Sequence, residues 1–130
     1  MNLLTYAVTE RLLNNGAVPD GTDHKPVVKF FTPDAGAIWL ITEMSPDEPD
    51  SLFGLCDLGL GTPELGTVSL LELKGLRGNL GLRVERDRHF KATHTLSVYA
   101  EAARLAGRIV LKRKSLDGAA AKLAQKQSRA

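Results

Sequence analysis

The architecture of this chain is set by residues 27–44, which read VVKFFTPDAGAIWLITEM. The two ends of this stretch, residues 27–31 and 37–44, are rich in β-branched and aromatic residues, and such runs favour β-strands. Pro33, Asp34 and Gly36 stand between the two runs, where their residue types favour a tight turn. The stretch therefore predicts an antiparallel β-hairpin.

Further strands are expected downstream of the hairpin. Residues 52–58 carry apolar side chains on both alternate faces, which predicts a central strand that is covered on both sides. A short strand is expected around Val68. Residues 82–90, LRVERDRHF, are strongly charged and predict a strand near an edge of the sheet.

Helix-capping signals predict three short helices. Ser69 and Glu72 have the spacing of a capping box, in which a serine hydroxyl accepts from one backbone amide and a glutamate accepts from another. Gly16 and Gly107 supply the left-handed residue at which helices commonly end. The helices are expected to begin at Thr5 or Thr9, at Leu70 and at Thr95.

Together these elements predict the α+β class. We expect a single domain over residues 1–111, with a mainly antiparallel sheet of about 4–5 strands and about three short helices. A chain of 130 residues, of which 43% are hydrophobic, is long enough to bury a core of its own. Residues 112–130 are basic and rich in alanine, and we expect them to form a frayed helix or a disordered tail.

Composition also bears on location. The longest apolar runs are far shorter than the about 20 residues that a membrane-spanning helix needs. Residues 1–16 lack the basic start, the sustained apolar run and the cleavage site of a secretory signal. A single cysteine, Cys56, cannot form an internal disulfide, which agrees with a reducing compartment. We therefore expect a cytoplasmic protein that does not enter a membrane.

Acidic and basic residues are unevenly placed along the chain, although the net charge is only +2. Residues 30–73 contain eight acids and no Lys or Arg, whereas residues 74–130 contain fourteen Lys and Arg and four acids. Two interpretations are open. The two halves can fold together and neutralise each other, or the molecule can keep an acidic and a basic pole that orient it on a nucleic acid or a charged protein.

Two arginines in the predicted edge strand illustrate this choice. In an extended strand, Arg86 and Arg88 point to the same side as Val84. Either they pair with carboxylates, for which Asp57 and Glu64 are natural partners, or they face an anion such as a phosphate. The candidate residues for binding an anion or a partner are Arg86, Arg88, His89, Lys112, Arg113 and Lys114.

Reactive side chains do not follow the spacing of a known catalytic or metal-binding motif, since the chain contains neither HExxH nor CxxC. His89 and His94 are five residues apart, which suits neither one face of a helix nor one face of a strand. We therefore predict no catalytic residue, no metal site and no cofactor. The alternative is a carboxylate and histidine site for a cation or for acid–base chemistry, formed by His24, Asp57 and Glu64.

Four runs carry a family resemblance: DHKPVVKFFTPDAGAIWLITEMSPDEPD at 23–50, LFGLCDLGLGTPELGTVSLLEL at 52–73, VERDRHF at 84–90 and LSVYAEAA at 96–103. Together they resemble a bacterial family catalogued as domain of unknown function twenty-nine fifty-eight, over about residues 3–107. The resemblance implies a small stand-alone protein carried on plasmids and integrative elements, near antirestriction and DNA-maintenance genes. It implies no activity and no catalytic residue, and the basic tail lies outside it.

Three functions from different classes follow as expectations. The favoured one is a non-enzymatic accessory binding protein of mobile-element origin, acting on a nucleic-acid or protein partner through its segregated acidic and basic surfaces. The first alternative is a small metal-dependent or hydrolytic enzyme. The second is an acidic mimic that inhibits a DNA-binding protein, against which the net charge of +2 argues.

Overall fold

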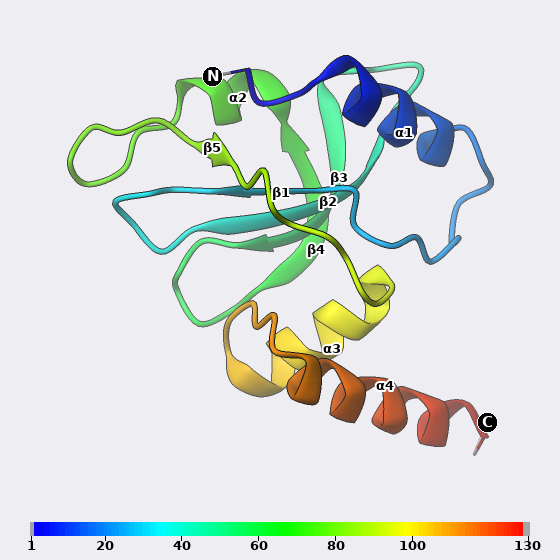
Figure 1. Ribbon diagram of the computed structural model, residues 1–130. Coiled ribbons are helices and arrows are strands. Elements are labelled where there is room, and N and C mark those ends of the chain that lie inside the picture. The colour runs from blue at the N-terminus through cyan, green and yellow to red at the C-terminus, as the bar shows by residue number, and fades with distance from the viewer. Residues whose placement is uncertain (1, 129–130) are drawn as a thin grey trace.

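The computed structural model describes residues 2–128, and one antiparallel sheet lies at its centre (Figure 1). The strands are β1 (Val28–Phe31), β2 (Ile38–Met44), β3 (Ser51–Asp57), β4 (Glu64–Ser69) and β5 (Glu85–Arg86). Their order across the sheet is β4-β3-β2-β1-β5, and each neighbouring pair is antiparallel. The predicted α+β class with a mainly antiparallel sheet is confirmed.

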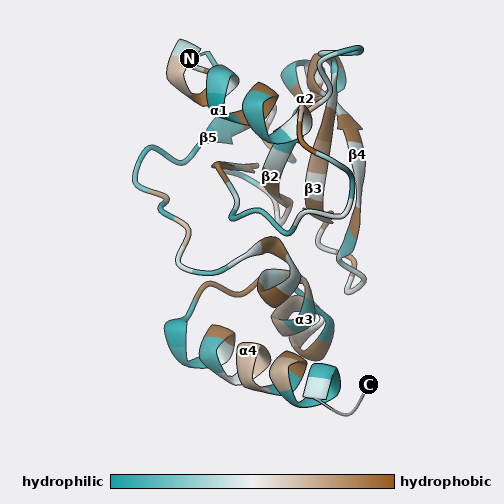
Figure 2. Ribbon diagram, turned by 90° about the vertical axis from the view of Figure 1, so that its right-hand side faces the viewer, coloured by the Kyte–Doolittle hydropathy of each residue, from teal (hydrophilic) through white to brown (hydrophobic). Residues whose placement is uncertain are grey.

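Four helices cover the sheet. Figure 1 shows the first two above the sheet and the last two below it, and the side view in Figure 2 shows the last two packed together at one end of the molecule. These helices are α1 (Tyr6–Gly16), α2 (Leu70–Gly75), α3 (Leu96–Ala106) and α4 (Arg113–Ser128). No helix in the described part of the chain combines the length and the apolar character that crossing a bilayer requires.

The predicted hairpin is formed by β1 and β2. Phe30 lies opposite Trp39 and Val28 lies opposite Ile41, so these four side chains project from the same face of the sheet. The register of β2 with β3 shifts between Ile41 and Glu43, where Thr42 forms a β-bulge. The extra residue changes the alternation, so that the buried Met44 returns to the face of Ile41.

The two faces of the sheet bury separate cores. Trp39 and Leu52 belong to a core beneath α1 and α2, to which Leu12 and Leu73 contribute. Leu40 and Leu55 belong to a core beneath α3 and α4, and the latter core also contains Leu96, Tyr99, Ala103 and Leu116. Strand β3 is therefore covered on both sides, as its apolar pattern predicts.

The C-terminal segment was expected to be a frayed helix or a disordered tail, and residues 113–128 form the helix α4, which is packed rather than frayed. Leu116 and Ala119 are almost fully buried against α3. Two side-chain contacts add to this packing, His94 Nε2 to Asp117 Oδ1 at 2.8 Å and Lys126 Nζ to Glu101 Oε2 at 3.1 Å. Residues 129 and 130 of the expected tail lie outside the described part.

Strand β5 is much shorter than the predicted strand over residues 82–90. Asp87 ends it, because its Oδ1 accepts from the backbone N–H of His89 at 2.9 Å and turns the chain. After this turn Phe90 packs into the core beneath α3 and α4. The turn therefore projects Arg88 and His89 to the surface, where both are exposed.

Candidate anion-binding cleft

A cleft of about 560 Å³ lies between α1, the segment before β1 and the turn after β5. Five of its lining residues are basic or histidine, and none is an acid. We call it the basic cleft, and it is lined by Arg11, Lys25, Pro26, Val27, Arg88, His89, Phe90, Lys91 and Ala92.

Helix α1 supplies the first cation of the basic cleft. Thr5 caps the start of this helix, and its Oγ1 accepts from the N–H of Val8 at 3.2 Å. Leu12 is fully buried beneath the helix. The neighbouring Arg11 points away from that core, because successive helical residues are about 100° apart, and its side chain is exposed in the cleft.

Lys25 comes from the connection between α1 and β1. This connection is held against the sheet by the buried Pro26 and by the N–H of Val27, which donates to the carbonyl of Ile41 at 2.8 Å. The carbonyl of His24 accepts from the N–H of Leu96 at 2.8 Å, which fixes the connection to the start of α3. Lys25 is thus an exposed cation on a well-anchored backbone.

Asp87 shapes the opposite wall of the basic cleft. The N–H of His89 donates to its carboxylate, and Lys29 Nζ lies 3.3 Å from its Oδ2. The hydrogen bond from His89 is the larger cause that lowers the pKa of Asp87, and the contact with Lys29 adds to it. This carboxylate therefore neutralises Lys29, which lies outside the cleft lining, and it forms no ion pair with Arg88.

The cations of the basic cleft form no ion pair within residues 2–128. The ion pairs of that range join Lys29 to Asp87, Arg104 and Lys126 to Glu101, and His94 to Asp117. Arg11, Lys25, Arg88 and Lys91 therefore keep their positive charge available to a ligand.

A smaller cleft of about 300 Å³ adjoins the basic cleft and shares Arg11, Lys25 and Val27 with it. It adds His24, whose Nε2 is buried and has no hydrogen-bond partner in the described part of the chain. It also adds Asn15, whose amide donates to the carbonyl of Thr42 at 2.9 Å and so ties the end of α1 to β2.

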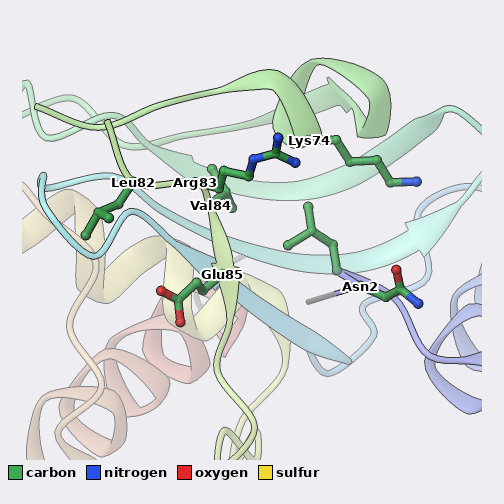
Figure 3. Close-up of a pocket in the computed structure, with 7 residues that line it drawn as sticks. Asn2, Lys74, Leu82, Arg83, Val84 and Glu85 are labelled. Carbon is green, nitrogen blue, oxygen red and sulfur yellow. The ribbon is translucent and has the colours of Figure 1, made fainter. Parts of the chain in front are cut away.

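A second basic pocket, of about 430 Å³, lies where the N-terminal segment approaches residues 82–85. Figure 3 shows the side chains of Lys74 and Arg83 on one side of the segment formed by residues 82–85, and those of Leu82 and Glu85 on the other. The remaining lining residues are Asn2, Leu3 and Val84.

Of the two alternatives for Arg86 and Arg88, ion pairs with Asp57 or Glu64 are absent within residues 2–128. Arg86 instead donates from Nη1 to the carbonyl of Asn2 at 2.7 Å, because β5 is the sheet edge farthest from β4 and faces the N-terminal segment. Arg88 lines the basic cleft together with His89. The other candidates lie at the start of α4 and line none of the clefts described above: Lys112, Arg113 and Lys114.

The structure does not gather His24, Asp57 and Glu64 into one site. His24 contacts the first residue of α3, whereas Asp57 Oδ2 accepts from the N–H of Ile109 at 2.8 Å, beyond the other end of that helix. An 11-residue helix is about 16 Å long, so the two residues lie about that far apart. Glu64 lies opposite Cys56 and thus projects from the face opposite to that of Asp57.

Three of the eight acids in residues 30–73 bind backbone amides: Asp34, Asp50 and Asp57. Asp34 Oδ2 accepts from the N–H groups of Leu80 and Leu82 at 2.6 and 3.1 Å, and Asp57 accepts from two backbone N–H groups. Asp50 accepts from the hydroxyl of Ser69 and the N–H of Leu71, and these hydrogen bonds, the hydroxyl first, lower its pKa. Within residues 2–128, no ion pair joins this acidic segment to the basic one.

Three residues of the basic cleft were not among the predicted site residues. Arg11, Lys25 and Lys91 belong to segments that are far apart in the sequence and meet only in the folded chain. Their sequence carries no signal except positive charge, and the chain has seventeen Lys and Arg. The segregation of charge pointed to Arg88 and His89 in one wall of the cleft, whereas Arg11 and Lys25 lie in a charge-balanced region.

No curated protein and no solved structure matches the chain. One family model, described as Protein of unknown function (DUF2958), matches residues 3–110. This range contains all five strands, helices α1 to α3 and every residue of the basic cleft, whereas α4 lies outside it. The chain therefore belongs to the family Protein of unknown function (DUF2958).

Proposed function

We propose that the protein is a non-enzymatic nucleic-acid-binding protein whose basic cleft contacts phosphate groups. The observation that carries this proposal is the gathering of Arg11, Lys25, Arg88 and Lys91 around one cleft without a neutralising acid in its lining. We place the protein in the cytoplasm and in an accessory role on mobile elements, as the lone cysteine and the family resemblance led us to expect.

The chemistry of the cleft suits phosphate. Guanidinium groups such as those of Arg11 and Arg88 present paired N–H donors that match two phosphate oxygens, and lysine adds a flexible point charge. A concave surface lined by one sign of charge also raises the local concentration of oppositely charged ligands. Each phosphate that is neutralised releases condensed counterions, so the affinity must fall as salt rises.

The lining favours a nucleic acid over a protein partner. Protein interfaces bind through apolar and aromatic anchors at their centres. In the basic cleft Pro26 is buried, and Val27, Phe90 and Ala92 are only partly exposed, so the accessible groups are mainly cations. Such a surface fits a continuous row of phosphates better than a folded protein surface.

A matched pair of double variants tests the proposal. Arg88→Ala with Lys91→Ala removes two charges from the cleft, whereas Arg108→Ala with Lys122→Ala removes two exposed charges elsewhere. Binding to labelled DNA of about 24 nucleotides, single- and double-stranded, is measured by fluorescence anisotropy between about 50 and about 200 mM salt. The cleft variant should bind roughly tenfold more weakly, and the slope of log affinity against log salt should become shallower by about 2.

Two results would contradict the proposal. One is the absence of binding by the unmodified protein to either DNA at low salt. The other is an equal loss of affinity in the cleft variant and in the Arg108 and Lys122 variant, because that result would reflect only the net charge. Circular dichroism and thermal unfolding of each variant show whether the fold is retained.

A further inference from the structure

We infer that the basic cleft and the second basic pocket are two parts of one phosphate-binding track, and that this track follows the backbone of duplex nucleic acid. The inference rests on the proposed function and goes beyond it, because it names the form of the nucleic acid and adds Lys74 and Arg83 to the contact surface.

The two depressions share their walls. One wall of each is the segment that contains β5, since residues 82–85 line the second pocket and residues 88–92 line the basic cleft. The other wall of each is N-terminal, with Asn2 and Leu3 at the second pocket and Arg11 at the basic cleft. We call the line between these walls the basic seam.

Arg86 lies between the two depressions and joins the two walls of the basic seam. Its pairing opposite Phe30 in β1 turns its side chain to the α1 face, where Nη1 donates to the carbonyl of Asn2. This bond joins β5 to the N-terminal segment and leaves the guanidinium charge unneutralised, because a carbonyl carries no net charge. Arg86 thus adds a cation between the two depressions.

One acid, Glu85, is among the residues that line the second pocket. It lies opposite Phe31, so it projects to the face opposite to that of Arg86, and Figure 3 shows its carboxylate on the side away from Lys74 and Arg83. Asp87 lies on the same side as Glu85 and contacts Lys29. The cations along the seam are Lys74, Arg83, Arg86, Arg88, Lys91, Arg11 and Lys25.

The dimensions of the basic seam match a duplex backbone. The five residue steps from Arg83 to Arg88 span at most about 17 Å, the length of a fully extended chain, because the chain turns at Asp87. One strand of a DNA duplex carries a phosphate about every 3.4 Å along the helix axis, so this length corresponds to several phosphates and at most about five. A ligand that covers both depressions must therefore be a polymer rather than a single nucleotide.

The side chains along the basic seam favour a duplex over a single strand. Proteins that bind single strands stack the bases on exposed aromatic rings. Phe90 is partly buried in the core beneath α3 and α4, which leaves His89 as the exposed ring of the basic cleft. A duplex needs no such platform because its bases already stack on each other, and phosphate contacts carry no base sequence.

The far end of the basic seam is rigidly held. The carboxylate of Asp34 binds the N–H groups of Leu80 and Leu82, and the backbone N–H of Gly78 donates to the carbonyl of Leu82 at 2.8 Å. Arg83 therefore follows a fixed turn, which lowers the conformational entropy lost when it binds a phosphate.

Three double variants that each remove two charges test the inference. They are Lys74→Ala with Arg83→Ala at the second pocket, Arg88→Ala with Lys91→Ala at the basic cleft, and Arg108→Ala with Lys122→Ala as the control. Affinity for a duplex and for a single strand of equal length is measured over the salt range given above. The first two variants should each lose roughly tenfold in affinity for the duplex and about 2 in salt slope, and the unmodified protein should prefer the duplex.

The outcomes separate the inference from the proposed function. If the Lys74 and Arg83 variant behaves like the control while the Arg88 and Lys91 variant is weakened, the track is wrong and the basic cleft alone binds DNA. Preference for the single strand overturns the assignment to duplex. If the Arg88 and Lys91 variant also behaves like the control, the proposed function itself fails. Lys74→Gln with Arg83→Gln repeats the measurement in case the alanine variant does not fold.

Discussion

The buried carboxylate of Asp57 joins the sheet to the connection between α3 and α4. Its Oδ1 accepts from the N–H of Gly59 and its Oδ2 from the N–H of Ile109, each at 2.8 Å. Replacing Asp57 by Asn turns one acceptor into a donor that faces a backbone N–H. We expect the free energy of unfolding to fall by about 1–3 kcal/mol, measured by urea denaturation. Asp47→Asn, at an exposed loop acid, is the control and should change little.

The residue type of Asp57 was visible in the sequence, but its role was not. A carboxylate after an apolar strand is equally compatible with a metal ligand, an ion pair and an acceptor for backbone amides. The choice depends on Ile109, which is 52 positions away along the chain. Thr5 and Ser69 behave differently, because each caps the helix that directly follows it. Local sequence predicted the Ser69 cap and left Thr5 and Thr9 as alternatives for the first helix.

Even there, the capping box of α2 is only half formed. The hydroxyl of Ser69 accepts from the N–H of Glu72 as expected. The carboxylate that binds at this helix start is that of Asp50, from the loop before β3, which accepts from the N–H of Leu71 at 2.8 Å. A contact of this kind depends on the fold and has no local signature.

Glu101 makes the stability of the α3–α4 pair depend on pH. Hydrogen bonds from Arg104 and Lys126, that from Arg104 being the larger cause, lower the pKa of Glu101 from 4.5 to about 2. Because the folded pKa is below the ordinary value, the stabilisation is complete above about pH 4.5 and is lost as the pH falls towards 2.

Glu101→Gln removes this contribution. The variant should be less stable at neutral pH by about 1 kcal/mol or less, since both cations are more than half exposed and are screened by salt. Its deficit relative to the unmodified protein should shrink as the pH is lowered from 4.5 to 2, which unfolding in urea at each pH measures. A deficit that stays constant over this window would show that Glu101 acts through packing rather than charge.

At the scale of elements, the hairpin of β1 and β2 was predictable because its strands and turn are contiguous in sequence. Helix α4 was not, because its buried face consists mainly of small residues. Leu116 and Ala119 are almost fully buried and Ala120 and Leu123 are partly buried, with a spacing that places them along one face. Alanines contribute little apolar area, so this face lacks the strong hydrophobic pattern by which amphipathic helices are identified.

The docking of α4 can be tested at its largest fully buried side chain. Leu116 is 1% exposed and packs among the residues of α3, whereas Leu111, just before the helix, is 40% exposed. Leu116→Ala should lower the free energy of unfolding by about 2–5 kcal/mol, and the matched Leu111→Ala should lower it far less. Equal and small losses in urea denaturation would show that α4 contributes little to the folded core.

The basic cleft was only partly predictable for a related reason. Residues 88 and 89 were identified because they lie in a charged segment, but the cleft exists only where α1 and the connection before β1 approach that segment. Its other wall comes from the first quarter of the chain, where Arg11 and Lys25 are balanced by acids in the sequence count. The sequence shows which residues are positively charged, but only the fold determines which of these cations line the same cleft.

Across the whole molecule, the acidic and basic segments fold together without neutralising each other through ion pairs. Three of the eight acids in residues 30–73 bind backbone N–H groups and thereby stabilise turns and helix starts: Asp34, Asp50 and Asp57. The cations of the basic seam consequently remain free. These three acids therefore stabilise the fold, which agrees with our proposal that the basic seam is the binding surface.

This division of roles predicts the behaviour of acids that make no side-chain hydrogen bond within residues 2–128, such as Asp47 and Glu64. Asp47→Asn with Glu64→Gln removes two negative charges, and because neither contacts a cation the free energy of unfolding should change by about 0.5 kcal/mol or less. Duplex DNA affinity should rise about two- to threefold at low salt, since long-range repulsion falls, and the gain should fade as screening increases.

The same variant also tests the alternative that the two halves neutralise each other. If these acids balanced cations of residues 74–130, their removal would leave repulsion among the cations and lower the stability, most of all at low salt. Urea denaturation at about 20 mM and about 500 mM salt distinguishes the two cases, because only the alternative produces a deficit that salt relieves. A salt-relieved loss of more than about 1 kcal/mol would show that the acidic segment serves to neutralise the basic one.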